Sequence, residues 1–186
     1  MRVIAGAAKG RPLAVPRGGA TRAATDRVRE ALFATIEPRL AAARVLDLFA
    51  GAGTLGIEAL SRGAARATFV ERSAAAVTAM RKNLLVTGLA DSADVVAANV
   101  LSFLERPGGP YDLAFCDPPF ADSAILEAAL AHPNLAASLA PGALVVARVH
   151  RKHRPALALP ARVVRVKEIG EESLLFVQYD GSSAGG

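Results

Sequence analysis

The chain has 186 residues, of which 52% are apolar and 21% charged, and its formal net charge is +5. This length and balance predict one globular domain with a sizeable core, and no apolar run reaches the roughly 18 residues that span a bilayer. The single cysteine, Cys116, excludes a disulfide framework, and the N-terminal sequence lacks the apolar segment of a signal peptide. We therefore expect a cytoplasmic protein without a membrane partner.

The positive charge is concentrated near the N-terminus. Residues 1–44 hold nine basic and three acidic residues, whereas residues 45–186 hold thirteen basic and fourteen acidic ones. A basic segment on a near-neutral domain is typical of proteins that bind a polyanion such as RNA, although a merely solvated segment has the same composition. The residues expected to contact RNA are Arg2, Lys9, Arg11, Arg17, Arg22 and Arg27.

Residues 1–24 are interpreted as a basic N-terminal extension, and their short apolar pairs between Gly, Pro and basic residues are compatible with a β-hairpin. The next segment predicts a helix that begins at Thr25 or Asp26 and stops before Pro38. From residue 44 strands and helices alternate. Strands are expected at 44–49, 67–71, 93–99, 111–116 and 142–149, and helices at 54–63, 73–88, 102–104 and 123–131.

Residues 161–170 and 172–179 predict an antiparallel strand pair without an intervening helix. Together these elements indicate an α/β fold, with a doubly wound and mainly parallel seven-stranded sheet. We expect the main domain to cover residues 25–180 and residues 181–186 to form a disordered tail. In such sheets a ligand binds beyond the carboxyl ends of the strands, which directs attention to residues 47–53, Glu71, Asn99 and Asp117.

A glycine-rich loop follows the first strand of this sheet. Gly51, Gly53 and Gly56 have the G-x-G-x-x-G spacing, and Glu71 ends the next strand twenty residues after Gly51. This pattern is typical of a nucleotide site in which the acid binds ribose hydroxyls, although a tight turn without a ligand has similar residues. An aspartate in the loop, Asp47, would repel a pyrophosphate but attract the ammonium and sulfonium groups of S-adenosylmethionine.

The loop therefore favours S-adenosylmethionine over a dinucleotide as the cofactor. Asn99 follows the third strand, where it either contacts the adenine ring or caps the next helix. The residues expected at the cofactor are Asp47, Phe49, Gly51, Gly53, Gly56, Glu71, Arg72, Asn99 and Val100.

The sequence Asp117-Pro118-Pro119-Phe120 follows the fourth strand and is the candidate catalytic site. The Asp117 carboxylate and the Pro118 carbonyl can accept hydrogen bonds from an exocyclic amino group of a nucleobase, which positions its nitrogen for methylation. Phe120 offers a ring on which an unpaired or flipped base can stack. The alternative is a strand-end turn with a buried phenylalanine.

The motif is similar to the [DNS]-P-P-[YF] motif of amino-directed nucleic-acid methyltransferases. With "RVIAGAAKGRPLAVP", "TRAATDRVREALF", "DLFAGAGTLGIEALSRGA" and the closing strand pair, the chain resembles the bacterial 16S ribosomal RNA guanine-N2 methyltransferases of the RsmD type along nearly its whole length. The resemblance implies a class I methyltransferase fold and a cytoplasmic enzyme that methylates a guanine amine on an assembling small ribosomal subunit. We expect a monomer.

This sequence departs from the family pattern at three residues. Ala23 and Ala24 stand where the family usually has Pro and Thr, and Arg148 stands where a glutamate commonly ends the fifth strand. Arg148 could instead bind RNA phosphate together with Arg151, Lys152, His153 and Arg154. The resemblance also marks Asn83, which is otherwise interpreted as an exposed mid-helix residue, and it places Arg27 and Glu30 at the cofactor mouth unless they pair with each other.

Two other functions compete with RNA methylation. A DNA adenine-N6 or cytosine-N4 methyltransferase would share the motifs, but a separate target-recognition domain is not apparent in the sequence. A non-catalytic RNA-binding assembly factor could keep the fold, but it would not need Asp47, Glu71 and Asp117. The spacing of His132, His150 and His153 does not suggest metal ligands, and we expect no metal.

Overall fold

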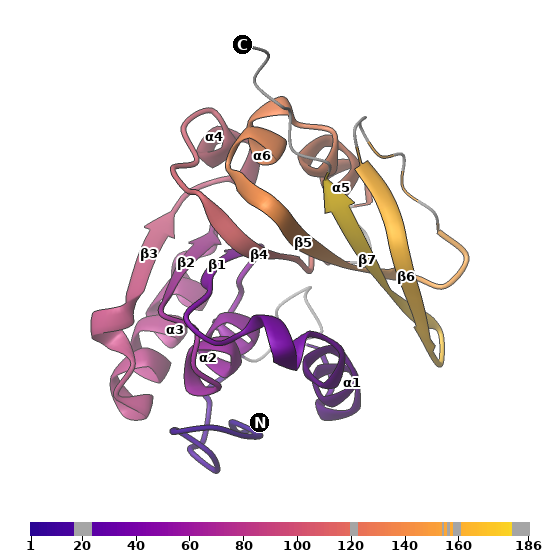
Figure 1. Cartoon of the computed structure of the whole chain (residues 1–186). Helices are drawn as coiled ribbons and strands as arrows, with labels where there is room; N and C mark the ends of the chain where they lie inside the picture. The colour runs from indigo at the N-terminus through magenta and orange to yellow at the C-terminus, as the bar shows by residue number, and fades with distance from the viewer. Residues whose placement is uncertain (17–23, 120–122, 154, 156, 158–160, 180–186) are drawn as a thin grey trace.

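The computed structural model describes residues 1–16, 24–119, 123–153, 155, 157 and 161–179. A seven-stranded sheet lies between two layers of helices, with α1, α2 and α3 on one face and α4, α5 and α6 on the other (Figure 1). The strand order is β3-β2-β1-β4-β5-β7-β6. The doubly wound seven-stranded sheet expected from the sequence is therefore confirmed.

The strands of one half are parallel, and only the last strand runs against its neighbours. β7 pairs antiparallel with both β5 and β6, while β1 to β5 pair with one another in parallel. The expected terminal pair thus exists, and β7 inserts between β5 and β6. The strands are β1 (Arg44–Leu48), β2 (Arg66–Glu71), β3 (Ala93–Ala97), β4 (Tyr111–Cys116), β5 (Leu139–His150), β6 (Ala161–Ile169) and β7 (Glu172–Tyr179).

The helices begin and end at the capping residues that the sequence shows. The Thr25 hydroxyl accepts from Val28 N before α1, and the Ser73 hydroxyl accepts from Ala76 N before α3, which is followed by Gly88 as its C-cap with φ +72°. The helices are α1 (Asp26–Ile36), α2 (Thr54–Ser61), α3 (Ala74–Thr87), α4 (Val100–Leu104), α5 (Ser123–Leu130) and α6 (Pro133–Ala137), with short 3₁₀ turns η1 (Glu37–Arg39) and η2 (Ala90–Ser92).

Two features of the chain were not predicted from the sequence. The five-residue helix α6 begins at Pro133, where His132 caps it by accepting from Asn134 N. β5 begins at Leu139, three residues before the expected start, although it contains Pro141 and Gly142. Its first pair with β4 is followed by a register shift, and such irregularities accommodate residues that a regular strand disfavours.

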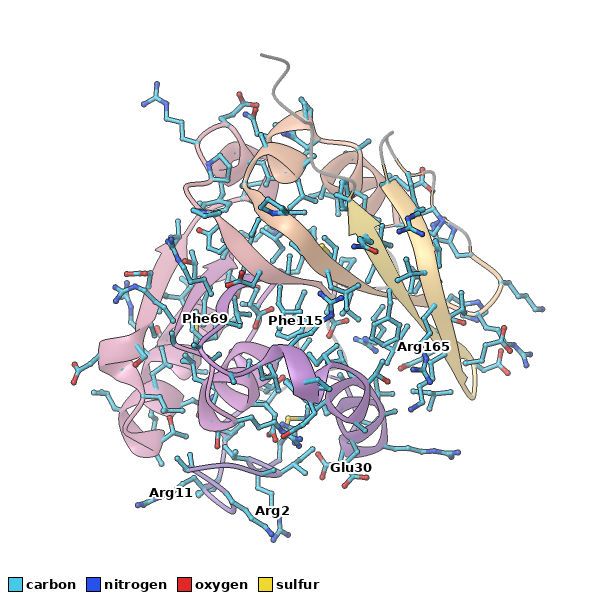
Figure 2. The ribbon with its side chains drawn as sticks, viewed as in Figure 1. Arg2, Arg11, Glu30, Phe69, Phe115 and Arg165 are labelled. Carbon is cyan, nitrogen blue, oxygen red and sulfur yellow. The ribbon has the colours of Figure 1, made fainter. Side chains whose placement is uncertain are left out.

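The core divides into one cluster on each face of the sheet because alternate strand residues point to opposite sides. Phe69 and Phe115 point toward α1 and α2 (Figure 2), and the Phe33 ring of α1 meets Phe115 edge-on at 5.9 Å between centroids. On the other face Leu46, Cys116 and their neighbours pack against α4, α5 and α6. Cys116 is buried as expected, and burial raises the pKa of its thiol.

The N-terminal segment is joined to the main domain through α2. An isolated bridge pairs Arg2 with Pro12, and the segment between them turns back beneath α2 (Figure 1). The backbone N–H groups of Ile4 and Ala5 donate to the buried carboxylate of Glu58 at 2.8 and 2.9 Å. Val3, Ala8 and Leu13 belong to the core cluster of this face.

A buried ion cluster anchors this junction. Arg29 and Glu58 have no exposed side-chain surface, and Arg29 also contacts Asp26 and donates to the Arg2 carbonyl. Arg62 contacts Glu58 at 2.8 Å and stacks over the Phe33 ring. Residues 1–16 therefore share the core of the main domain rather than standing apart from it. Within the described residues, no helix has the length and apolarity to cross a membrane.

Candidate functional site

A cavity of about 280 Å³ opens at the carboxyl ends of β1 to β4. The loop after β1, the end of β2, the turn after β3 and the corner after β4 meet there, as the parallel sheet requires. The walls are largely apolar. The lining residues are Val15, Pro16, Phe49, Ala50, Gly51, Ala52, Thr54, Val70, Glu71, Arg72, Ser73, Ala76, Ala98, Asn99, Val100, Asp117, Pro119 and Ile125.

The glycine loop wraps one side of this cavity in an unusual backbone conformation. Phe49, Gly51 and Gly53 have φ angles of +63°, +55° and +80°. A positive φ at a phenylalanine is strained, and such strain is commonly found at functional sites. The Glu71 carboxylate accepts from Gly51 N at 2.9 Å and from Ser73 N at 2.7 Å. Glu71 therefore ties the loop to the end of β2 while lining the cavity.

Asp47 lies behind the glycine loop rather than in the cavity. It is 1% exposed, it does not line the cavity, and its Oδ2 accepts from Gly56 N at 2.9 Å. Burial raises its pKa to about 8, partly opposed by this hydrogen bond. The expectation that an Asp47 carboxylate directly attracts a cationic ligand therefore needs correction. Its carboxyl group holds the first turn of α2 in place.

Gly53 and Gly56 also lie behind the cavity. A Cβ atom at Gly56 would lie 2.3 Å from Cε1 of Phe69, and one at Gly53 would lie 2.8 Å from Cγ of Met80. Phe69 fills the space between α2 and β2 (Figure 2). These two glycines permit close packing of the helix against the sheet, whereas Gly51 lines the cavity.

We expect Asp47→Asn to remove a pH dependence of stability. The pKa of Asp47 in the folded chain lies above the ordinary value of 3.8. Between about pH 4 and pH 8 the folded chain therefore keeps a proton on Asp47 that the unfolded chain has already lost. The free energy of unfolding of the wild type should thus fall as the pH rises across this window, by up to about 1.4 kcal/mol per pH unit relative to the variant. Urea denaturation of both proteins at several pH values measures the difference. Parallel curves would contradict the burial argument.

The turn after β3 resolves the two interpretations of Asn99. Its Oδ1 accepts from Leu101 N at 2.9 Å, so Asn99 caps α4. The residue also lines the cavity together with Val100, and the exposed Arg72 lines it after β2. Capping therefore positions Asn99 at the cavity, and the two interpretations are compatible.

The diproline corner closes the opposite side of the cavity. Asp117 is 8% exposed and lines the cavity, as does Pro119. Pro118 is buried and lines a second, smaller cavity of about 30 Å³, to which Pro119 and Arg148 also contribute. Phe120 lies outside the described residues, so its expected stacking role stays a prediction.

Arg148 contradicts the expectation that it binds RNA phosphate. It is 4% exposed, its Nε contacts Asp117 Oδ1 at 2.5 Å, and its Nη1 contacts Glu172 Oε1 at 3.1 Å. A buried arginine that bridges two carboxylates is not available to a phosphate on the surface. Arg151 and Lys152 are exposed, whereas Arg154 lies outside the described residues.

Asn83 is buried, not exposed as its helical position suggested. Its Oδ1 accepts from Ala14 N at 2.8 Å, and its Nδ2 donates to the carbonyls of Ala14 and Ala52 at 2.9 Å each. This amide joins the N-terminal segment to the glycine loop, and Val15 and Pro16 beyond it line the cavity. Sequence reasoning missed the amide because nothing in a single sequence shows which helix face is covered by a distant segment.

The basic residues of the N-terminal segment point outward. Arg2, Lys9 and Arg11 are exposed, and Arg2 and Arg11 project from the same side of the molecule (Figure 2). Arg27 is exposed on α1, and neither it nor Glu30 lines the cavity. The lining of this cavity therefore does not support their expected place at the cofactor mouth. Arg17 and Arg22 lie outside the described residues.

Comparison with known proteins identifies the class and then the family. A seven-stranded sheet with β7 antiparallel between β5 and β6, and a glycine loop after β1, defines a Rossmann-like methyltransferase fold. The solved structure of the Escherichia coli protein yhhF superposes with a TM-score of 0.87, at 37% identity over 98% of this chain and 99% of that one. The family model "Conserved hypothetical protein 95" matches residues 1–178, and the chain belongs to this family.

Curated relatives with a functional name match part of this chain. The protein named "Ribosomal RNA small subunit methyltransferase D" of Escherichia coli K12 is 48% identical over 120 residues, covering 64% of this chain and 60% of the relative. The protein of the same name from Haemophilus influenzae is 39% identical over 123 residues, covering 64% of each chain. The matched region thus spans less than two thirds of these relatives.

Proposed function

We propose that this protein is an S-adenosylmethionine-dependent methyltransferase that methylates the exocyclic N2 amine of a guanine in small-subunit (16S) ribosomal RNA. The observation that carries the proposal is a single cavity that joins the glycine loop and Glu71 to Asp117 of the diproline corner. The names of the two curated relatives, which match about two thirds of this chain, supply the class of RNA. We place the activity in the cytoplasm.

The chemistry of the cavity fits S-adenosylmethionine better than a dinucleotide. Glu71 and Asp117 contribute two carboxyl groups, and the apolar wall includes Phe49, Val70 and Val100. A pyrophosphate would face both carboxylates, whereas a cofactor with ammonium and sulfonium groups and an adenine ring gains from acids beside an apolar wall. Glu71, Asn99 and the backbone of Gly51 would hold it. The bound cofactor supplies a methyl group on a positively charged sulfur.

The diproline corner has the groups needed to orient an amine. Asp117 lines the cavity, where its carboxylate would accept a hydrogen bond from a target amino group. The carbonyl of the next residue, Pro118, is the second candidate acceptor. Two acceptors would fix both N–H groups of the amine and direct the nitrogen lone pair toward the methyl donor. Positioning of this kind supplies much of the rate enhancement of many enzymes. The buried setting of Asp117 strengthens its hydrogen bonds relative to water.

Cofactor titration followed by a methylation assay tests the proposal. Calorimetry should show binding of S-adenosylmethionine and S-adenosylhomocysteine and no binding of NADH. Incubation with labelled cofactor and either deproteinised 16S RNA or isolated small subunits should then yield N2-methylguanosine after nucleoside analysis. N6-methyladenosine or N4-methylcytosine would instead indicate a different amino-directed enzyme. Cofactor binding with no methylated nucleoside from any substrate would favour a non-catalytic RNA-binding factor.

We expect the exposed basic residues of the N-terminal segment to contribute to RNA affinity. Replacing Arg2 and Arg11 with Ala should weaken RNA binding and reduce the slope of log affinity against log salt, by about 0.7 to 0.9 for each lost phosphate contact. Fluorescence anisotropy at several salt concentrations measures this slope. A control that removes two exposed arginines elsewhere, Arg81 on α3 and Arg165 on β6, should have a smaller effect. Equal slopes in the two double variants would contradict the assignment.

A further inference from the structure

The structure places three charged side chains from three strands in one buried cluster beneath the diproline corner. Asp117 follows β4, Arg148 lies in β5, and Glu172 begins β7. Arg148 Nε contacts Asp117 Oδ1 at 2.5 Å, and Arg148 Nη1 contacts Glu172 Oε1 at 3.1 Å. The Arg148 side chain is 4% exposed, and those of Asp117 and Glu172 are 11% and 18% exposed.

The sheet register dictates this arrangement. Cys116 of β4 pairs with Ala147 of β5, so the next residues, Asp117 and Arg148, continue side by side. His150 of β5 pairs with Glu172 of β7, which places Glu172 diagonally across from Arg148. The arginine fork thus spans the boundary between the parallel and antiparallel parts of the sheet. A lysine, with one ammonium group, could not reproduce such a bridge.

We propose that Arg148 is a positioning residue, which holds the Asp117 carboxylate oriented and anionic for contact with the target amine, and that Glu172 secures Arg148 from the opposite side. The inference rests on the proposed amine methylation and extends it to two residues that do not line the cofactor cavity. Among the described residues, Arg148 is the hydrogen-bond partner of the Asp117 carboxyl group, through Oδ1. This contact orients Asp117 without occupying Oδ2.

The charges of the cluster predict the direction in which the pKa of Asp117 should shift when one partner is changed. Burial raises the pKa of Asp117, the positive charge and hydrogen bond of Arg148 oppose this rise, and the negative charge of Glu172 adds to it. The negative charge of Asp117 also acts on two neighbouring acids, Asp47 on β1 and the Cys116 thiol, and raises the pKa of each. Without Arg148, Asp117 would be a carboxyl group buried among acids, which favours its neutral form. A protonated carboxyl group loses much of its strength as an acceptor for an amine.

Three variants separate charge control from a merely structural role. Arg148→Gln keeps a hydrogen-bond donor but removes the positive charge, so it should raise the pKa of Asp117. Arg148→Lys loses the fork but keeps a positive charge near Asp117. Because of this charge, the pKa of Asp117 should stay close to its wild-type value. Glu172→Gln keeps an acceptor for Arg148 and removes a negative charge, so it should shift the pKa of Asp117 in the opposite direction. Simple loosening of the fold would not produce opposite shifts.

The experiment measures the pKa of Asp117 in two independent ways. Carbon-13 NMR of labelled aspartate carboxyl groups is recorded without cofactor, and the signal of Asp117 is assigned with Asp117→Asn. The pKa of Asp117 should be lowest in Glu172→Gln, intermediate in the wild type and highest in Arg148→Gln. The gap between the last two should be about 1 to 3 units. The single-turnover methylation rate should fall at low pH as Asp117 is protonated, and this acid limb should lie at higher pH in Arg148→Gln and at lower pH in Glu172→Gln. The rate of Arg148→Gln should recover at high pH.

Failure of this inference can be told from failure of the proposed function. If the wild type methylates RNA and the variants share its Asp117 pKa and acid limb, Arg148 does not control Asp117 and the inference is wrong. If the NMR order holds but no substrate is methylated, Arg148 still controls the charge of Asp117, while the proposed amine contact is overturned. Thermal unfolding of each variant confirms that the compared proteins are folded. If either Arg148→Gln or Glu172→Gln does not fold, the other is compared with the wild type alone, and the direction of its Asp117 pKa shift still tests the inference.

Discussion

Asp117→Ala is expected to reduce the single-turnover methylation rate by about 10²-fold or more, which corresponds to about 3 kcal/mol of lost transition-state stabilisation. The change removes the carboxylate of a residue that lines the cavity at the end of β4. Cofactor affinity should fall far less than the methylation rate, because Glu71 remains and the glycine loop and Glu71 are held by contacts that do not involve Asp117. Rates at saturating RNA, paired with a calorimetric cofactor titration, measure both effects.

A matched control lies at the other end of the same strand. Asp112 is exposed in β4, and its carboxylate accepts from Arg44 N, so Asp112→Ala removes a carboxylate far from the diproline corner. Its methylation rate should stay close to wild type. Asp117→Asn supplies a neutral acceptor and should lose less activity than the alanine variant, with no acid limb from residue 117. A wild-type methylation rate in Asp117→Ala would show that the diproline corner is only a strand-end turn without a catalytic role.

Local patterns in the sequence are sufficient to predict most elements of the sheet. Apolar runs of five or six residues, separated by helices with recognisable caps at Thr25, Ser73 and Gly88, correspond to β1 to β4 and to α1 and α3. These signals are local, since capping and periodicity depend on neighbouring residues. The doubly wound sheet could be predicted because parallel strands joined by helices have few allowed connections, although the order of the strands was not predicted.

Contacts between distant segments could not be predicted in the same way. Asn83 has its partners at Ala14 and Ala52, and Glu58 has its partners at Ile4, Ala5 and Arg29. A polar residue on a helix indicates an exposed face unless another segment covers it, and one sequence does not show which segment does. Arg148 was misread for the same reason. Its charge suggested a surface contact, whereas its carboxylate partners, Asp117 and Glu172, come from other strands.

The candidate site was predicted in outline and corrected in detail. Residues at the ends of strands, such as Glu71 and Asp117, line the cavity because the fold brings these ends together. Asp47, Gly53 and Gly56 belong to the same sequence motif, yet they lie behind the cavity, where they hold α2 against β2. A motif therefore marks residues that shape a loop as well as residues that face its ligand.

Glu58→Gln is expected to destabilise the protein by about 3 to 5 kcal/mol, because it leaves the fully buried charge of Arg29 without its buried counter-ion. The Glu58 carboxylate also accepts from Ile4 N, Ala5 N and Arg62 Nε. A glutamine keeps one acceptor oxygen and places an amino group where the second was, so at least one buried donor loses its partner. The N-terminal segment should consequently detach more readily from α2.

Two measurements and one control separate the loss of this anchor from a general charge effect. Urea denaturation gives the change in free energy of unfolding, and limited trypsin digestion should cleave after Lys9 sooner in the variant than in the wild type. Glu37→Gln is the matched control, since Glu37 contacts the same Arg62 at 2.8 Å but its side chain is 55% exposed. An exposed ion pair contributes about 1 kcal/mol or less, so this control should remain near wild-type stability. Equal losses in both variants would show that the buried Arg29–Glu58 pair does not anchor the segment.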